Sequence, residues 1–356
     1  MATAPSDMHL ARSPSPPVDA KAVARLVRQS LARREVQLVV VTLLVFAITT
    51  AHDSGFATTG NISFLIADTM AVAIVAIGET IVVLTRGIDL SVAPILGTAA
   101  LATGFLAQNH GLTPLELLPL ALVIGAVMGA GNGVLVAFAG IPPIIATLGT
   151  LAVYSGVQGI IANGQEVVTL PPSYFNLGND DWFSAIPYVG VIGLAVALGF
   201  ALILWRTRFG RNVYAVGNNA EAARRAGIDV KRVLVIAYVL SGTLAGLGGL
   251  VFLAHVGSAD STTGTDSNIQ LTAIAATLIG GSTLTGGKGG TIGSYLAAIF
   301  LSVALAALVD FRINPIWEPA GVGVLILVAM LADTTTGRPT LRSILTALLE
   351  RPGGRP

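Results

Sequence analysis

Repeated apolar runs are the feature that most constrains what this chain can fold into. From residue 36 onward, runs of apolar residues are separated only by short, turn-rich breaks. Most runs approach the roughly 20 residues that an α-helix needs to cross the hydrocarbon core of a bilayer. The charged fraction agrees, because it is 11% here and about 25% in soluble domains. The sequence therefore predicts an all-α integral membrane protein.

About ten transmembrane helices fit the pattern. They are expected near residues 36–51, 66–85, 91–107, 115–138, 142–162, 186–205, 233–254, 269–281, 290–310 and 317–332. The eighth run is short and polar enough to be a broken or re-entrant segment.

The distribution of basic residues sets the expected orientation. Seven of the 20 Lys and Arg residues lie in 206–232, so this loop is expected in the cytoplasm. Basic residues near both ends place both termini in the cytoplasm as well. An even number of crossings must then follow the basic loop, so the segment 269–281 has to count as one of them. Residues 1–35 are predicted to be a disordered, basic cytoplasmic tail that approaches membrane lipid, 36–335 the transmembrane domain with its cytoplasmic loop at 206–232, and 336–356 a second cytoplasmic tail. The net charge of +1 gives no reason to expect a nucleic-acid partner.

A short helix is predicted inside the basic loop. Asn218 is followed three positions later by Glu221, which is the pattern of a capping box, and Gly227 can end the helix. The helix carries both signs of charge, so it can dock into a cleft of a cytoplasmic partner. It can equally lie on anionic lipid, and the spacing leaves both interpretations open.

Acidic residues near the second span allow an ion-driven alternative. Asp68 and Glu79 are eleven positions apart, which predicts nearly the same helix face, and a secondary transporter would place its coupling groups there. The simpler interpretation puts Asp68 near the headgroups and lets Glu79 bond to a neighbouring helix. Asp89 can pair with Arg86, or the next span can be capped by either Asp89 or Ser91.

Neutral polar side chains mark a candidate translocation path along the fourth and fifth spans. They suit a neutral polyhydroxyl solute, although such groups also bond within their own helices. The five residues are Asn132, Thr147, Thr150, Tyr154 and Gln158.

Two glycine patterns have structural interpretations. Glycines at spacing four predict helix-packing faces, namely Gly125, Gly129 and Gly133, and Gly242 and Gly246. The glycine-rich stretch 280–289 fails as a phosphate-binding loop, since Ser282 replaces its first glycine and Gly289 follows Lys288 where Ser or Thr is needed. It is instead predicted to form flexible turns at the inner face. We expect no catalytic residue, metal or cofactor in this chain.

Several stretches together resemble the permease subunit of bacterial ATP-binding cassette (ABC) sugar importers, the ribose-permease-like group of the branched-chain amino acid and sugar permease family. The resemblance covers about residues 40–335. The matching stretches are GIDLSV at 87–92, GNG at 131–133, IPPIIATLGT at 141–150, FGRNVYAVGNN at 209–219, EAAR at 221–224, AGI at 226–228 and GGKG at 286–289.

This resemblance implies a multi-pass permease of the bacterial inner membrane with no ATPase site of its own. ATP would be bound by cytoplasmic ABC ATPase subunits, and a second permease, identical or related, and an extracytoplasmic sugar-binding protein would complete the importer. It also implies that residues 218–227 form the coupling helix that the ATPase receives. The residues carried over are Asn218, Asn219, Glu221, Ala222, Ala223, Arg224 and Gly227.

Overall fold

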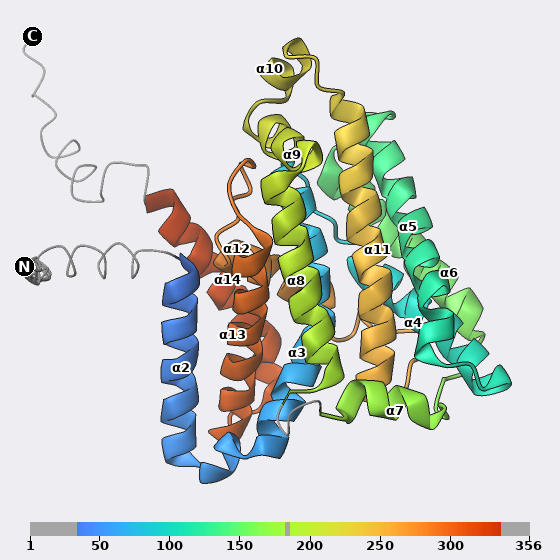
Figure 1. Ribbon diagram of the computed structural model, residues 1–356, viewed down its shortest axis with the longest axis vertical. Helices are drawn as coiled ribbons and strands as arrows, with labels where there is room; N and C mark the ends of the chain where they lie inside the picture. The colour runs from blue at the N-terminus through green and yellow to red at the C-terminus, as the bar shows by residue number, and fades with distance from the viewer. Residues whose placement is uncertain (1–33, 182–185, 336–356) are drawn as a thin grey trace, which may run out of the picture.

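The protein is a bundle of helices in the computed structural model, which describes residues 34–181 and 186–335 (Figure 1). No β-strand forms within these two ranges. The long helices are α2 (Arg34–His52), α3 (Thr59–Leu84), α4 (Val92–His110), α5 (Pro114–Ala137), α6 (Pro143–Ala162), α8 (Tyr188–Arg206), α11 (Val230–Val256), α13 (Thr291–Asp310) and α14 (Glu318–Thr335). The shorter ones are η1 (Ser54–Ala57), α7 (Pro172–Asn179), α9 (Arg208–Asn218), α10 (Ala220–Arg225), α12 (Ile269–Ile279) and η2 (Pro315–Trp317).

Each of the ten predicted spans corresponds to one helix of the structure. Seven of the helices in the described ranges are both long and apolar enough to cross a membrane, namely α2, α3, α5, α6, α8, α11 and α13. The predicted all-α membrane fold is therefore confirmed. The two tails predicted at 1–35 and 336–356 lie almost entirely outside the described residues.

The helix that contains the second predicted span starts earlier than the apolar run. Helix α3 begins at Thr59 rather than near residue 66. The carboxylate of Asp53 accepts a hydrogen bond from the Gly55 N–H at 2.8 Å and caps the single turn η1, so the chain reverses within a few residues. Polar residues such as Asn61 and Ser63 hid the first turns of this helix from an apolar pattern.

Helix α12 is too short to cross a bilayer alone. It has 11 residues, which is about 16 Å at 1.5 Å per residue, whereas the hydrocarbon core is about 30 Å thick. Turns precede it, and its last turn is followed by the glycine-rich stretch 280–289. The expectation of a broken segment at 269–281 is therefore supported by the geometry.

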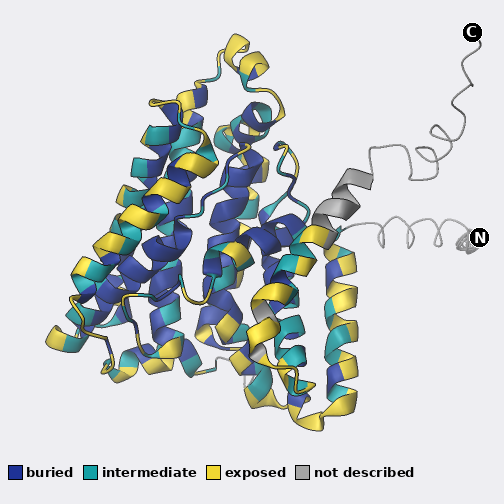
Figure 2. Ribbon diagram, turned by 180° about the vertical axis from the view of Figure 1, so that it is seen from behind, coloured by how far each residue is buried: buried dark blue, intermediate teal, exposed yellow. Residues whose placement is uncertain are grey.

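Helix α3 lies at the centre of the bundle and α2 at its edge. In the most apolar 18-residue window of each helix, 83% of the residues of α3 are buried, compared with only 11% of those of α2. Figure 2 shows the same division, with dark blue ribbon inside and yellow faces outside. Apolar residues cover α2 on its exposed side, among them Val40, Leu43 and Leu44. Such a surface is stable only in contact with lipid or another apolar surface.

Glycines bring α5 and α11 into close contact, as their spacing predicted. A Cβ added at Gly125 would collide with the carbonyl oxygen of Gly242, and one added at Gly129 would collide with that of Tyr238. A Cβ added at Gly246 would collide with the carbonyl oxygen of Ala121. The small residues therefore form a packing face within the chain, because only glycine lets the two backbones approach this closely.

Candidate functional site

The basic loop 206–232 forms two helices, where one was predicted. Helix α9 starts after Thr207, whose hydroxyl accepts a hydrogen bond from the Gly210 N–H at 3.1 Å. It continues to Asn218, and extended backbone at Asn219 (φ −161°, ψ 105°) separates it from α10. Figure 1 shows α10 at the far end of the molecule, beyond the ends of the long helices.

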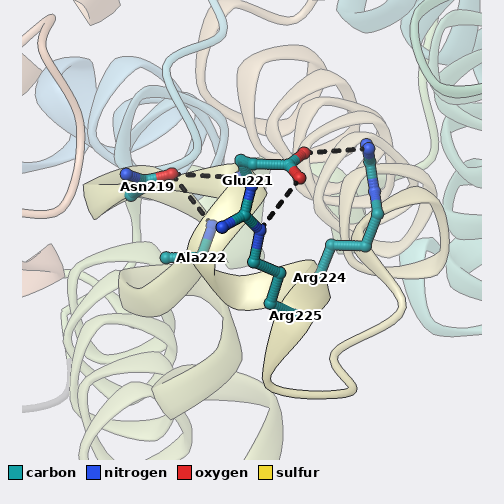
Figure 3. A network of polar contacts seen from close by, with 5 residues as sticks. All are labelled: Asn219, Glu221, Ala222, Arg224 and Arg225. Carbon is teal, nitrogen blue, oxygen red and sulfur yellow. Dashed lines mark hydrogen bonds and ion pairs between the residues drawn. The ribbon is translucent and has the colours of Figure 1, made fainter.

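The residue that caps α10 is Asn219, one position later than predicted. Its side-chain oxygen accepts hydrogen bonds from the N–H groups of Glu221 and Ala222, both at 3.0 Å (Figure 3). Asn218 instead ends α9, so the predicted capping box between Asn218 and Glu221 does not form. Two successive asparagines made the register ambiguous in sequence, and the end of α9 decides it. Gly227 ends the turn as predicted, with φ 82°.

Charged side chains cover the outer face of α10. Glu221 bridges two arginines, to Arg224 at 3.2 Å and to Arg225 at 3.3 Å (Figure 3). The side chains of Glu221, Arg224 and Arg225 are 57%, 66% and 80% exposed, respectively. On the opposite face, Ala223 is buried in an apolar cluster with residues of α9 and of the ends of α3 and α8. Among the predicted coupling residues, Ala222 is exposed and Ala223 faces inward.

Arg86 holds the C-terminal end of α9, a role that the sequence analysis missed. Its Nε donates to the carbonyl oxygen of Gly217 at 2.6 Å, and its terminal nitrogen donates to that of Asn218 at 2.6 Å. Of the two roles that the sequence left open for Asp89, pairing with Arg86 is therefore not the one that the structure shows. A cation is stabilised at a helix C-terminus because unpaired carbonyl oxygens and the helix dipole gather negative charge there.

Asp89 is fully buried in a polar network instead. Its carboxylate accepts hydrogen bonds from the N–H of Ser91 at 3.1 Å and from the Ser91 hydroxyl at 2.7 Å. The side-chain amide of Asn132 donates to the carboxylate at 3.3 Å and to the Ser91 hydroxyl at 2.7 Å. Ser91 is the residue before α4, as expected, but its side chain does not cap the helix.

The two acids of α3 lie in different environments. Glu79 is fully buried, and its carboxylate accepts a hydrogen bond from the Asp89 N–H at 3.0 Å. Asp68 is exposed and lies 4.0 Å from His255. The interpretation in which Glu79 bonds within the bundle is supported, although its partner belongs to the segment before α4 rather than to a neighbouring helix.

The five candidate path residues all form hydrogen bonds within the chain. The Thr147 hydroxyl donates to the Ile88 carbonyl oxygen at 3.0 Å, and the Tyr154 hydroxyl donates to that of Met128 at 2.8 Å. Gln158 donates to the carbonyl oxygen of Thr263 at 3.0 Å. Thr150 donates within α6 to Thr147 at 3.3 Å, and Asn132 joins the Asp89 network. The structure thus adds a buried carboxylate to a path that was predicted to be free of charge.

A separate cavity of about 970 Å³ lies between α3, α11, α12, α13 and α14. Asp68, His255, Asp266 and Asp310 are among its lining residues, and none of the five candidate path residues borders it. Within residues 34–181 and 186–335, no three His, Asp or Glu side chains are grouped to hold a metal ion.

The helical bundle, with seven helices in the described ranges that are long and apolar enough to cross a membrane, defines a multi-pass membrane protein. The family described as the branched-chain amino acid transport system permease component matches residues 61–332. The chain belongs to this family, and it is the permease component of an ABC importer in the bacterial inner membrane. This finding removes the ion-driven secondary transporter as an alternative.

The relatives that the chain resembles are also permeases of one kind of importer. The autoinducer 2 import system permease protein LsrC of Klebsiella pneumoniae is 36% identical over 303 residues, which covers 85% of this chain and 87% of the relative. The protein of the same name from an Enterobacter species is 36% identical, and the match covers 89% of this chain and 90% of the relative. The protein of the same name from Photorhabdus luminescens is 33% identical, and the match covers 84% of this chain and 89% of the relative. No solved structure gives a significant match.

Proposed function

We propose that α10 is the coupling helix of this permease and that a cytoplasmic ABC ATPase receives it. The single observation that carries this proposal is the shape and chemistry of the segment 218–227. It extends beyond the bundle, and its three charged side chains are more than half exposed. ATP would be bound and hydrolysed on the ATPase alone, so this chain would need no cofactor.

The composition of α10 favours a protein partner over a lipid surface. A helix that lies in the membrane interface buries large apolar side chains on one face. The exposed positions of α10 carry Glu221, Ala222, Arg224 and Arg225, none of which is a large apolar residue. Its apolar side, at Ala223, already packs inside this chain. The exposed face therefore suits a polar cleft with charges of both signs.

The solute that we propose is neutral and sugar-like. The relatives are named for import of autoinducer 2. Along the candidate path on α5 and α6, the side-chain carbonyl oxygens of Asn132 and Gln158 have no hydrogen-bond partner among the described residues, so they can accept from a hydroxyl group. A charged solute would lose its hydration without a free partner charge there, because Asp89 already accepts several hydrogen bonds. Each hydroxyl bond to a sugar contributes only about 1 kcal/mol net, which is weak enough to permit release.

The complete importer would contain further subunits. We propose that two permeases, either two copies or this chain with a relative, stand side by side in the lipid bilayer. An extracytoplasmic sugar-binding protein would deliver the solute, and the coupling helices of both permeases would move as the ATPases close around ATP. Both termini and α10 would then lie on the cytoplasmic side.

Copurification tests the coupling proposal. The full chain is purified from its native membrane, and the amount of ATPase retained is compared with that of two double variants. Glu221→Ala with Arg224→Ala removes two of the three charges of α10 and leaves Arg225 without its ion pair, so it should lower ATPase retention. Glu221→Arg with Arg224→Glu exchanges the two charges, so it keeps an intrahelical ion pair and the net charge. It should also lower retention, because the ATPase would then meet each charge at the wrong position. Full retention by both variants, with both inserted in the membrane, would contradict the proposal.

A further inference from the structure

One short segment contacts both the α9–α10 region and the candidate path. The connecting segment, residues 85–91, joins α3 to α4. On one side Arg86 donates two hydrogen bonds to the last carbonyl oxygens of α9, both at 2.6 Å. These bonds bridge positions that are 131 and 132 residues apart in the chain.

The other side of the connecting segment meets α5 and α6. The Ile88 carbonyl oxygen accepts the hydroxyl of Thr147 at 3.0 Å. Asn132 donates to the carboxylate of Asp89 and to the hydroxyl of Ser91. Within six residues, 86–91, the chain therefore bonds to the end of α9 and to two of the five candidate path residues.

Close packing limits independent movement of the connecting segment. Arg86 has φ 70°, a left-handed conformation that few residues other than glycine adopt. A Cβ added at Gly87 would come within 2.7 Å of the Tyr238 hydroxyl and of a Val82 methyl carbon, so the backbone already fills this space. Glu79 holds the Asp89 N–H from the side of α3.

The glycine-rich stretch 280–289 completes the junction, and it forms turns, as predicted. The Gly287 N–H donates to the Leu84 carbonyl oxygen at 3.0 Å, and the Tyr214 hydroxyl of α9 donates to the Gly289 carbonyl oxygen at 2.9 Å. A Cβ added at Gly286 would meet the Arg86 side chain, and one at Gly217 would collide with the Leu84 carbonyl oxygen. These glycines let three backbone segments meet around Arg86.

We propose that Arg86 is a positioning residue that couples movement of α9 and α10 to Asn132 and Thr147 through the connecting segment. The inference rests on the proposed coupling role of α10. When the ATPase displaces α10, the end of α9 moves with it. The two hydrogen bonds and the charge of the guanidinium, placed at the negative end of α9, carry the connecting segment along. That movement shifts the hydrogen-bond acceptors of Asn132 and Thr147 and thereby changes access to the path.

The test uses Arg86→Gly in the purified complex of the permease, its ATPase and the binding protein. Glycine adopts the left-handed conformation without strain, so this variant removes the guanidinium and leaves the backbone unstrained. Arg208→Ala is the matched control, because Arg208 is an exposed arginine at the opposite end of α9. Arg86→Lys, which keeps the charge but loses the planar pair of donors, should retain part of the coupling.

Deuterium exchange is measured in nucleotide-free and vanadate-trapped complexes. In the native chain and in Arg208→Ala, trapping should change exchange in peptides 208–227, 85–92 and 143–150. In Arg86→Gly the change in exchange should stay confined to 208–227. Solute uptake should fall about fivefold or more, which is the factor that corresponds to the loss of a typical coupling free energy between two sites.

The outcomes separate the two proposals. If trapping changes deuterium exchange at 85–92 and 143–150 in Arg86→Gly as it does in the native chain, the proposed role of Arg86 is overturned. An absence of any change at 208–227 in the native chain would instead overturn the coupling role of α10, and the role of Arg86 with it. A loss of ATPase retention in Arg86→Gly would assign Arg86 to ATPase docking and would also overturn its role in transmission.

Discussion

The Nε of Arg86 lies 2.6 Å from the carbonyl oxygen of Gly217, across 131 residues of sequence. This contact joins the end of the central helix α3 to the end of α9, the helix that leads into α10. An arginine bonded to two carbonyl oxygens at a helix terminus is favoured both by its donors and by its charge. The helix that leads into α10 is thus bonded to the segment that follows the central helix α3.

The proposed orientation can be tested by cysteine labelling, because the chain has no native cysteine. A single cysteine at Glu166, an exposed residue between α6 and α7, should react with a membrane-impermeant thiol reagent applied outside the cell. A cysteine at Arg225 should react only after the membrane is opened, since α10 is expected in the cytoplasm. Labelling of position 225 from outside would invert the proposed topology.

Substitution of the packed glycines should weaken the contact between α5 and α11. Gly242→Val places a side chain against the backbone of Gly125 and Gly129, so we expect a loss of about 1–3 kcal/mol or more of stability. Thermal aggregation of the detergent-solubilised protein measures this effect. Gly199→Val is the matched control, because a Cβ added there would meet no side chain and no other packed segment within 4 Å. Equal melting of the two variants would contradict the packing.

Asn219→Ala should destabilise α10 by about 1 kcal/mol, the usual cost of losing an N-cap. The amides of Glu221 and Ala222 lose their acceptor, so their hydrogen exchange should accelerate and ATPase retention should fall. Asn218→Ala is the control for the register of the cap, because that residue ends α9 instead. Faster exchange in Asn218→Ala than in Asn219→Ala would restore the cap position inferred from sequence.

Glu79→Gln should leave transport largely intact. The glutamine side chain retains a carbonyl oxygen that can accept the hydrogen bond from the Asp89 N–H. Glu79→Ala leaves that buried N–H without a partner, at a cost of about 1–3 kcal/mol, and should lower both melting temperature and uptake. Uptake is measured as a function of external pH for both variants. Abolition by Glu79→Gln in a pH-dependent manner would show that the carboxylate has a proton-coupling role.

Uptake of labelled pentoses, hexoses, polyols and branched-chain amino acids tests the proposed solute class. We expect saturable uptake of a neutral, polyhydroxylated compound. Because the path offers only weak hydrogen bonds, exchange of the binding protein should alter the preferred solute more than substitution of Thr150 or Gln158 does. Preferential uptake of a zwitterionic amino acid would overturn the sugar-like assignment and leave the membership of the permease family intact.

Features that depend on composition and local spacing could be predicted from the sequence. The ten apolar runs, the basic loop and the small residues between α5 and α11 follow from the cost of placing polar groups in lipid and from the helical repeat. Gly227 at the end of α10 follows from its conformational freedom alone. These are properties of single segments, so the surrounding structure changes them little.

Contacts between distant segments were decided only by the tertiary structure. Arg86 and Asp89 are close enough in sequence to form a pair, yet Arg86 turns to the end of α9 and Asp89 accepts a hydrogen bond from Asn132 on α5. The choice depends on which unpaired carbonyl oxygens and amides the packed helices bring near each charge. The register of the α10 cap and the close packing of 280–289 likewise depend on where α9 ends. Burial makes an unpaired polar group costly, so the partner that the fold supplies, rather than the neighbour in sequence, determines each contact.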